Sequence, residues 1–341
     1  MEVYIITEGG EKTGFGHLTR CISIYQAFEK KGIAAKLIIN GDKTINELIK
    51  NKRYKLFNWI NGKEKLFNII KKKADLAVID SYLAPNELYK KISELVKTAV
   101  YIDDNNRMTY PNGIVVNGTT YAKELNFKKR ACTTYFLGKK YALFRKEFWN
   151  IPVKKINKRL STILLLLGGT DPRNLTPEVL EYLNKEHLKL TKNVIINKGF
   201  KKLSELKKIK KNSHENTVNL IFNPDARRIK QIMLSSDIAI TTGGQTLYEL
   251  ARIGVPTIVI SAAENQMNSI KSWEKSGLVF YAGNWKNKEL MEKINEYVKK
   301  LYSYELRYRK SSKLKRIFDG KSTLRLIDEL IAHHGRYKNE K

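Results

Sequence analysis

The stretch "EKTGFGHLTR" places a titratable imidazole where a glycine-rich loop opens into a helix. Gly14 and Gly16 directly precede His17, and Leu18 begins a run of apolar residues at helical spacing. The positive end of a helix favours the neutral imidazole, which is the form that a general base requires. The pattern therefore makes His17 the candidate general base. The alternative is a histidine that only caps the helix or lies at the surface.

Arg20 follows one turn later. A guanidinium near a helix start is suited to contact a phosphate. Arg20 could equally extend inward along its helix, or be the partner of Asp80.

A second candidate site lies in "TTGGQTLYEL". Gly243 and Gly244 let a phosphate approach the backbone, while Gln245 and Thr246 begin a helix and add donors. Glu249 lies one turn into that helix, where its carboxylate can accept hydrogen bonds from a ribose diol. The alternative is a tight strand-to-helix turn followed by a solvated glutamate.

A similar turn, "LLGGTDPRN", contains Gly169. Beyond it we expect a helix with Thr176 as N-cap and Pro177 as its first residue. Neither glycine turn continues as a Walker loop, and the loop before His17 lacks the third glycine of G-x-G-x-x-G. We therefore expect no dinucleotide and no other cofactor.

Asp103 and Asp104 are similar to the Asp-x-Asp metal motif of sugar-nucleotide enzymes, but they are adjacent in this chain. We therefore propose no metal site, and a structural role at a strand end is the alternative.

Apolar runs alternate with helical patterns along the whole chain, which is typical of parallel, doubly wound sheets. The expected strands lie within 3–7, 34–40, 76–82, 99–104, 113–118, 161–167, 193–197, 218–223, 237–242 and 255–261. Ligands of such sheets bind beyond the carboxyl ends of the strands. The polar residues expected at those ends in the first half are Glu8, Asp80, Tyr82, Asp103, Asp104 and Asn117.

The pattern restarts after a charged, proline-containing stretch at 145–160. We therefore expect an α/β domain at 1–148, a second at 149–300, and a basic helical tail at 301–341.

The 341 residues carry a formal charge of +30, from 64 Lys and Arg against 34 Asp and Glu. The lysines are dispersed and no nucleic-acid-binding motif is visible, so the charge favours a small anionic substrate over a nucleic acid. Cys21 and Cys132 lack metal-ligand spacing, and no apolar run approaches the ~18 residues of a membrane span. We expect reduced thiols, a cytoplasmic monomer, and at most peripheral membrane contact.

Several motifs occur in an order typical of one family. They are "GFGHLTR", "VIDSY", "YIDDNNR", "FLGKKYALFRKEF", "LLGGTDPRNLT", "TTGGQTLYELARIGVPTIVI" and "AENQ". Over roughly residues 3–285 the chain resembles the UDP-2,4-diacetamido-2,4,6-trideoxy-β-L-altropyranose hydrolases of pseudaminic acid biosynthesis and the related spore-coat polysaccharide biosynthesis proteins.

The resemblance implies a GT-B fold, with two Rossmann-like domains facing across a cleft and a UDP-sugar held mainly by the C-terminal domain. It implies that His17 is catalytic and that Tyr82 lies close to the reacting sugar. It also implies a UDP site in the second domain, with Gly243, Gly244 and Gln245 at the diphosphate, Glu249 at the ribose, and Asn265 and Gln266 in a segment over sugar and phosphate.

This site predicts inverting hydrolysis without a metal, in which His17 takes a proton from the attacking water. The alternative is a glycosyltransferase that moves the sugar to a polysaccharide or lipid-linked acceptor.

Overall fold

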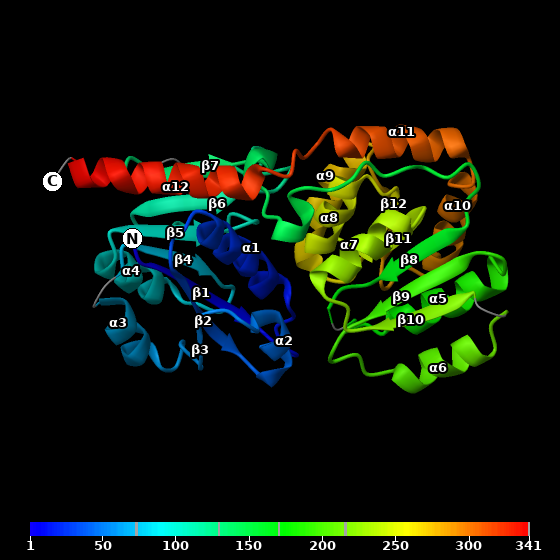
Figure 1. Cartoon of the computed structure of the whole chain (residues 1–341), viewed down its shortest axis with the longest axis horizontal. Helices are drawn as coiled ribbons and strands as arrows, with labels where there is room; N and C mark the ends of the chain where they lie inside the picture. Colours follow the sequence, from blue (N-terminus) through cyan, green and yellow to red (C-terminus); the bar gives the residue numbers. More distant parts are fainter. Residues whose placement is uncertain (72–73, 129, 170, 215–216, 340–341) are drawn as a thin grey trace. The chain divides into compact units, whose positions relative to one another are not determined.

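A computed structural model describes residues 1–341 except 72–73, 129, 170, 215–216 and 340–341 (Figure 1). The chain forms two compact units. The first comprises Met1–Lys146 together with Lys321–Lys341, and the second comprises Glu147–Gly320.

The first unit contains a seven-stranded parallel sheet in the order β3-β2-β1-β4-β5-β6-β7. Its strands are β1 (Val3–Gly9), β2 (Ala35–Gly41), β3 (Tyr54–Leu56), β4 (Leu76–Asp80), β5 (Thr98–Ile102), β6 (Gly113–Asn117) and β7 (Thr133–Leu137). Its α-helices are α1 (Gly16–Lys30), α2 (Asn46–Ile49), α3 (Lys63–Lys71), α4 (Asn86–Leu95) and α12 (Ser322–Asn339).

The second unit contains a six-stranded parallel sheet in the order β10-β9-β8-β11-β12-β13. Its strands are β8 (Thr162–Leu166), β9 (Thr191–Ile196), β10 (Val218–Phe222), β11 (Ile238–Thr242), β12 (Thr257–Ser261) and β13 (Phe280–Asn284). Its α-helices are α5 (Leu175–Glu186), α6 (Leu203–Lys211), α7 (Ala226–Ser235), α8 (Gln245–Ile253), α9 (Met267–Lys275), α10 (Leu290–Lys300) and α11 (Tyr304–Lys315).

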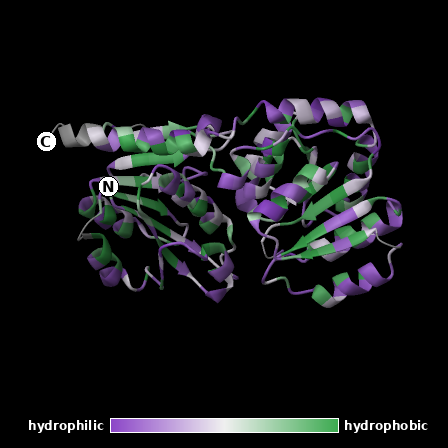
Figure 2. Ribbon diagram, in the orientation of Figure 1, coloured by the Kyte–Doolittle hydropathy of each residue, from purple (hydrophilic) through white to green (hydrophobic). Residues whose placement is uncertain are grey.

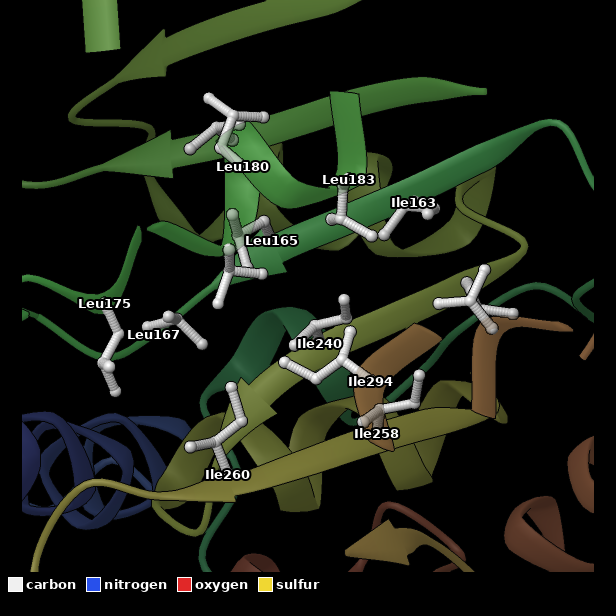
Figure 3. Packing of buried hydrophobic residues seen from close by; sticks show 14 of the residues in the cluster. Ile163, Leu165, Leu167, Leu175, Leu180, Leu183, Ile240, Ile258, Ile260 and Ile294 are labelled. Carbon is white, nitrogen blue, oxygen red and sulfur yellow. The ribbon is translucent and has the colours of Figure 1, made fainter. Parts of the chain in front are cut away.

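Continuous apolar runs form the central strands because both faces of these strands are covered by helices. In Figure 2 the strands are mainly hydrophobic, whereas the helices alternate between hydrophobic and hydrophilic residues. Figure 3 shows one of these cores, in which Ile163 and Leu165 of β8 and Ile240 of β11 pack near Leu183 of α5 and Ile294 of α10. This packing fixes the strand ends, and with them the loops that carry the candidate sites.

The expected alternation of strands and helices is confirmed, but three edge or near-edge strands were not predicted. They are β3, β7 and β13. β3 has only three residues, and most residues of all three strands are partly buried or exposed, so none has the continuous buried apolar run that identified the central strands.

The predicted start of α5 is wrong. The helix begins at Leu175, after Asn174 in the left-handed conformation, and the Thr176 side chain does not cap it. The buried Asp171 carboxylate instead accepts hydrogen bonds from the N–H groups of Leu175 (3.1 Å) and Thr176 (2.8 Å). Each carboxylate oxygen of Asp171 accepts from one of the free N–H groups, so Asp171 takes the capping position predicted for Thr176.

The segment 301–341 is helical as far as Asn339 but does not form a tail of its own, and its last residues, 340–341, lie outside the described residues. α11 belongs to the second unit, where it packs against α8, and α12 belongs to the first unit, where it packs against α1. Leu326, Ile327 and Leu330 of α12 are buried, and the Ser322 hydroxyl donates to the carbonyl of Ala142 at 2.6 Å.

Candidate active site

The candidate base lies where the strand order of the first sheet reverses. β1 is followed in sequence by β2 on one side, but it also pairs with β4 on the other. The loops after β1 and β4 therefore leave in opposite directions, which opens a crevice at the carboxyl ends of the strands. Asp80 ends β4 opposite Thr7 of β1, and His17 is the second residue of α1, directly after the β1 loop.

His17 and Asp80 form a hydrogen-bonded pair. His17 Nδ1 lies 2.7 Å from Asp80 Oδ1, and Asp80 is fully buried while the His17 side chain is 14% exposed. A carboxylate can only accept, so Nδ1 carries the proton and donates it. The lone pair of the neutral ring is then on Nε2, which is the geometry of a histidine base oriented by an aspartate.

Arg20 keeps Asp80 ionised. Its Nη2 lies 2.6 Å from Asp80 Oδ1, its Nε also donates to Asp80, and its Nη1 donates to Asp104. Burial alone would raise the pKa of the Asp80 carboxyl, but the positive charge of Arg20 and the hydrogen bonds from Arg20 and His17 outweigh it and hold that pKa well below its usual range. The structure supports the alternative in which Arg20 is the partner of Asp80. A phosphate would have to compete with two carboxylates for this guanidinium.

Tyr82 lies beside His17 and has a fixed orientation. The two rings meet edge to face with their centroids 4.5 Å apart, and the Arg107 guanidinium lies 4.5 Å from the centre of the Tyr82 ring. Asn105 Nδ2 donates to the Tyr82 hydroxyl at 2.9 Å. Burial raises the pKa of Tyr82, so this hydroxyl stays protonated at neutral pH and can donate to a ligand.

Sequence reasoning missed Asn105 and Arg107 as neighbours of Tyr82. Both follow β5 in "DDNNR", and β5 pairs with β4, so their position after a neighbouring strand was the available signal.

The two adjacent aspartates have different roles. Asp103 is buried and accepts from the backbone N–H groups of Asn105 (2.9 Å) and Arg107 (2.8 Å), which confirms the structural alternative for this residue. Asp104 instead pairs with Arg20. Within the described part of the chain, no group of three His, Cys, Asp or Glu side chains is placed to hold a metal ion.

The remaining polar residues predicted at these strand ends are buried. Glu8 accepts from the backbone N–H of Tyr82 at 2.8 Å and from the Ser81 hydroxyl. Asn117 accepts from the N–H and hydroxyl of Thr119 at 2.9 and 2.6 Å. Both shape loops at the edge of the sheet.

Gly14 and Gly16 border open space in the loop that precedes His17. A Cβ placed on either glycine would meet no atom within 4 Å, and Gly14 has a φ of +76° that strongly favours glycine. The loop is closed by the Gly10 N–H, which donates to the carbonyl of Gly14 at 3.0 Å.

The two glycine turns of the second unit lie on neighbouring strands. β8 pairs with both β9 and β11, so the strand order reverses between β8 and β11. Gly168, with a φ of +91°, lies directly after β8, and a Cβ placed on it would be 3.8 Å from the Thr242 hydroxyl at the end of β11. The second unit therefore has its own crevice, beside Gly169 and the start of α8.

Gly243 and Gly244 serve different purposes. A Cβ on Gly243 would lie 2.7 Å from a side-chain carbon of Ile270 in α9, so packing requires glycine there. A Cβ on Gly244 would meet nothing within 4 Å. The backbone at Gly244 is therefore approachable, directly before the first turn of α8, which begins with Gln245 and Thr246.

Glu249 is not solvated. It is only 2% exposed, which rules out the alternative of a surface glutamate. In the loop after β12, Asn265 is exposed, and Gln266 Oε1 accepts from the N–H of Ala262 at 3.0 Å. The structure thus places Glu249 inside α8 and gives Gln266 a role in holding its own loop.

Comparison with known proteins supports the fold. Residues 162–326 match the glycosyltransferase family 28 C-terminal domain. The structure is similar to MurG of Acinetobacter baumannii, with a TM-score of 0.67 at 14% identity, over 96% of this chain and 99% of that one. The chain has the GT-B fold.

Relatives in sequence carry the names that the motifs predicted. One is the pseudaminic acid cytidylyltransferase and UDP-2,4-diacetamido-2,4,6-trideoxy-β-L-altropyranose hydrolase of Helicobacter pylori, 26% identical over 82% of this chain and 48% of that protein. Another is a spore coat polysaccharide biosynthesis protein of Bacillus subtilis, 25% identical over 96% of each chain. The predicted resemblance is therefore confirmed.

An uncharacterized protein of Methanocaldococcus jannaschii is 28% identical over 78% of this chain and 57% of its own length. The chain thus spans about half the length of this protein and of the Helicobacter pylori relative. Among the helices that the structure describes, none is long and apolar enough to cross a membrane.

Proposed function

We propose that this protein hydrolyses a UDP-activated diacetamido-trideoxy sugar to UDP and the free sugar, with inversion at the anomeric carbon, as a step in making a pseudaminic-type nonulosonic acid. The observation that carries the proposal is the 2.7 Å contact between His17 Nδ1 and the buried Asp80 carboxylate, which leaves Nε2 as an acceptor. The name of the relative from Helicobacter pylori supports the substrate class.

In the proposed reaction, a water oxygen attacks the anomeric carbon on the face opposite UDP. The bond between that carbon and the β-phosphate oxygen breaks, and its electron pair leaves with UDP. The proton of the water passes to His17 Nε2, a general-base step worth about 10²–10⁴-fold in rate. Asp80 stabilises the imidazolium that forms, and Arg20 holds Asp80 in its ionised state.

The proposed role of the second unit is to bind UDP. The N–H groups at the start of α8 and the open backbone at Gly244 would face the diphosphate and neutralise the leaving group without a strong general acid. The residues assigned to this task are Gly169, Gly243, Gly244, Gln245, Thr246, Asn265 and Gln266. Glu249, which is buried in the first turns of α8, would accept hydrogen bonds from the ribose hydroxyls, as the family resemblance implies.

The proposed role of the first unit is to hold the reacting sugar. Gly14 and Gly16 border open space in the loop that precedes His17. The Tyr82 hydroxyl, kept protonated by burial, would donate a hydrogen bond to the sugar. An acetamido carbonyl is a suitable acceptor for it.

The decisive experiment measures UDP release from UDP-2,4-diacetamido-2,4,6-trideoxy-β-L-altropyranose in the absence of any acceptor, with the sugar followed by proton NMR. We expect UDP release together with the inverted anomer as the first product. Tight UDP binding with release only after an acceptor alcohol is added would instead identify a glycosyltransferase.

A further inference from the structure

α11 is attached to the second unit along one side. Arg307, Ser311 and Leu314 are buried, and their spacing of four and three residues places them on one side of the helix. The Arg307 guanidinium is fully buried and donates to the carbonyls of Leu301 (2.9 Å), Asn157 (2.8 Å) and Lys158 (3.0 Å). The helix is therefore firmly anchored, and its opposite side faces solvent.

That outer side is basic and partly aromatic. Arg309, Lys313 and Arg316 are exposed and follow each other at four- and three-residue spacing, so they form one row opposite the buried side. Tyr302 and Tyr308 are 47% and 54% exposed. We call these five residues the α11 face, although Tyr302 lies just before the helix and Arg316 is its C-cap; the helix itself is largely hydrophilic in Figure 2.

The charge of the α11 face is not neutralised locally. None of its three basic side chains has a hydrogen bond or ion pair with another residue in the described part of the chain. Between 299 and 316 the sequence contains eight basic residues and one acidic residue, Glu305. Three unpaired cations in a row require an external anion or water.

We propose that the α11 face docks this protein onto an anionic phospholipid surface. Arginine forms bidentate hydrogen bonds with phosphate, and tyrosine places an apolar ring and a polar hydroxyl at the level of lipid headgroups. The combination of unpaired basic residues with the exposed Tyr308 on one anchored helix, and with Tyr302 just before it, fits such a surface better than charge alone would.

α6 provides an internal control for charge. Lys207, Lys208 and Lys211 of α6 are exposed and basic, but α6 contains no aromatic residue. If the overall charge of +30 were enough for docking, the two helices would contribute equally. If the α11 face is the docking surface, replacing its basic residues must weaken binding more than replacing those of α6.

The test measures sedimentation of the full chain with vesicles of equal parts phosphatidylglycerol and phosphatidylcholine, at about 0.15 M salt, where charges beyond ~8 Å are screened. The triple variant Arg309→Gln, Lys313→Gln, Arg316→Gln should bind at least about tenfold more weakly than the natural chain. The charge-matched triple variant Lys207→Gln, Lys208→Gln, Lys211→Gln should bind nearly as well as the natural chain. Tyr308→Ser, which leaves the charge unchanged, should also weaken binding.

Equal losses in the two triple variants would overturn the proposal, because binding would then depend on net charge alone. No sedimentation of the natural chain with these vesicles, or equal sedimentation with pure phosphatidylcholine, would also overturn it. So would retention on duplex DNA that is lost in the α11 variant while vesicle binding is kept. UDP release by each variant is measured in solution, so a failure of the proposed hydrolysis would be seen separately.

Discussion

The crevices of the two sheets share a topology but differ in the residues that surround them. In the first unit, Asp80 at the end of β4 joins His17 and Arg20 of α1, and Arg20 also bonds to Asp104 after β5, in one network of hydrogen bonds. After β8 and β11 of the second unit, the turns carry paired glycines, and Gly244 leaves the backbone open directly before α8. A proton-transferring site needs an oriented side chain, whereas an anion site needs bare N–H groups, so the same topology can serve both purposes.

Each unit also buries an aspartate near its crevice, and the partners of the two aspartates differ. Asp171 of the second unit binds backbone N–H groups and caps α5. Asp80 of the first unit binds the side chains of His17 and Arg20. The hydrogen bonds of Asp171 complete the first turn of α5. The hydrogen bonds of Asp80 instead fix the orientation and tautomer of His17, whose side chain remains partly accessible.

Removing the imidazole should have the largest effect on the first crevice. We expect His17→Ala to lower kcat by at least about 10²–10⁴-fold while the Kd for UDP stays nearly unchanged, because the base acts only in the chemical step. Turnover assays and calorimetric titration with UDP check this. His214→Ala, at an exposed histidine of the second unit, is the control and should retain full turnover. Unchanged turnover in His17→Ala would remove His17 from the catalytic role.

Neutralising the aspartate should have the next largest effect. We expect Asp80→Asn to lower the free energy of unfolding by about 3–5 kcal/mol, because the buried Arg20 charge loses a partner. The acid limb of the pH–rate profile should also move to lower pH, since the anion that stabilises the imidazolium is gone. Urea unfolding and the pH–rate profile check the two effects. Asp104→Asn, at the more exposed partner of Arg20, should cost less stability. An unmoved acid limb would leave Asp80 with a structural role only.

Gly243 and Gly244 of the second unit should respond differently to replacement by alanine. We expect Gly243→Ala to cost about 1–3 kcal/mol of stability, because its methyl group would overlap Ile270. Gly244→Ala has room for a methyl group and should unfold at nearly the same temperature, yet bind UDP more weakly because the backbone is covered. Thermal unfolding and UDP titration of the two variants check this. Equal UDP affinity in Gly244→Ala and the natural chain would contradict a diphosphate site at α8.

Acid stability should show the smallest effect, and it follows from the lowered pKa of Asp80. The unfolded chain has the ordinary aspartate value of 3.8 and binds a proton more readily than the folded chain does. The contribution of Asp80 is therefore fully present above about pH 4 and is lost as the pH falls further. Urea unfolding should give a lower free energy of unfolding at about pH 3 than at about pH 5 in the natural chain. The difference between the two pH values should be smaller in Asp80→Asn. An equal difference in the two proteins would contradict an ionised Asp80.

Sequence reasoning predicted the central strands, but it missed an edge strand and a side-chain contact. Central strands such as β8 and β12 were predicted because burial on both faces demands an unbroken apolar run. Edge strands such as β3 lack that requirement and were missed. The cap of α5 was assigned to Thr176 by local spacing, but Asp171, farther upstream, reaches the same N–H groups through a folded loop.

The sequence by itself determined the two parallel sheets and the positions of His17, Gly243 and Gly244 at helix starts, because apolar periodicity and glycine turns are local properties. It also showed the resemblance that the relatives confirm. Only the tertiary structure decided that Asp80, 63 residues from His17 in the chain, fixes the histidine tautomer, and that Arg20 serves this aspartate. Those contacts depend on which strands lie side by side, and strand order is set by packing of the whole unit rather than by any short segment.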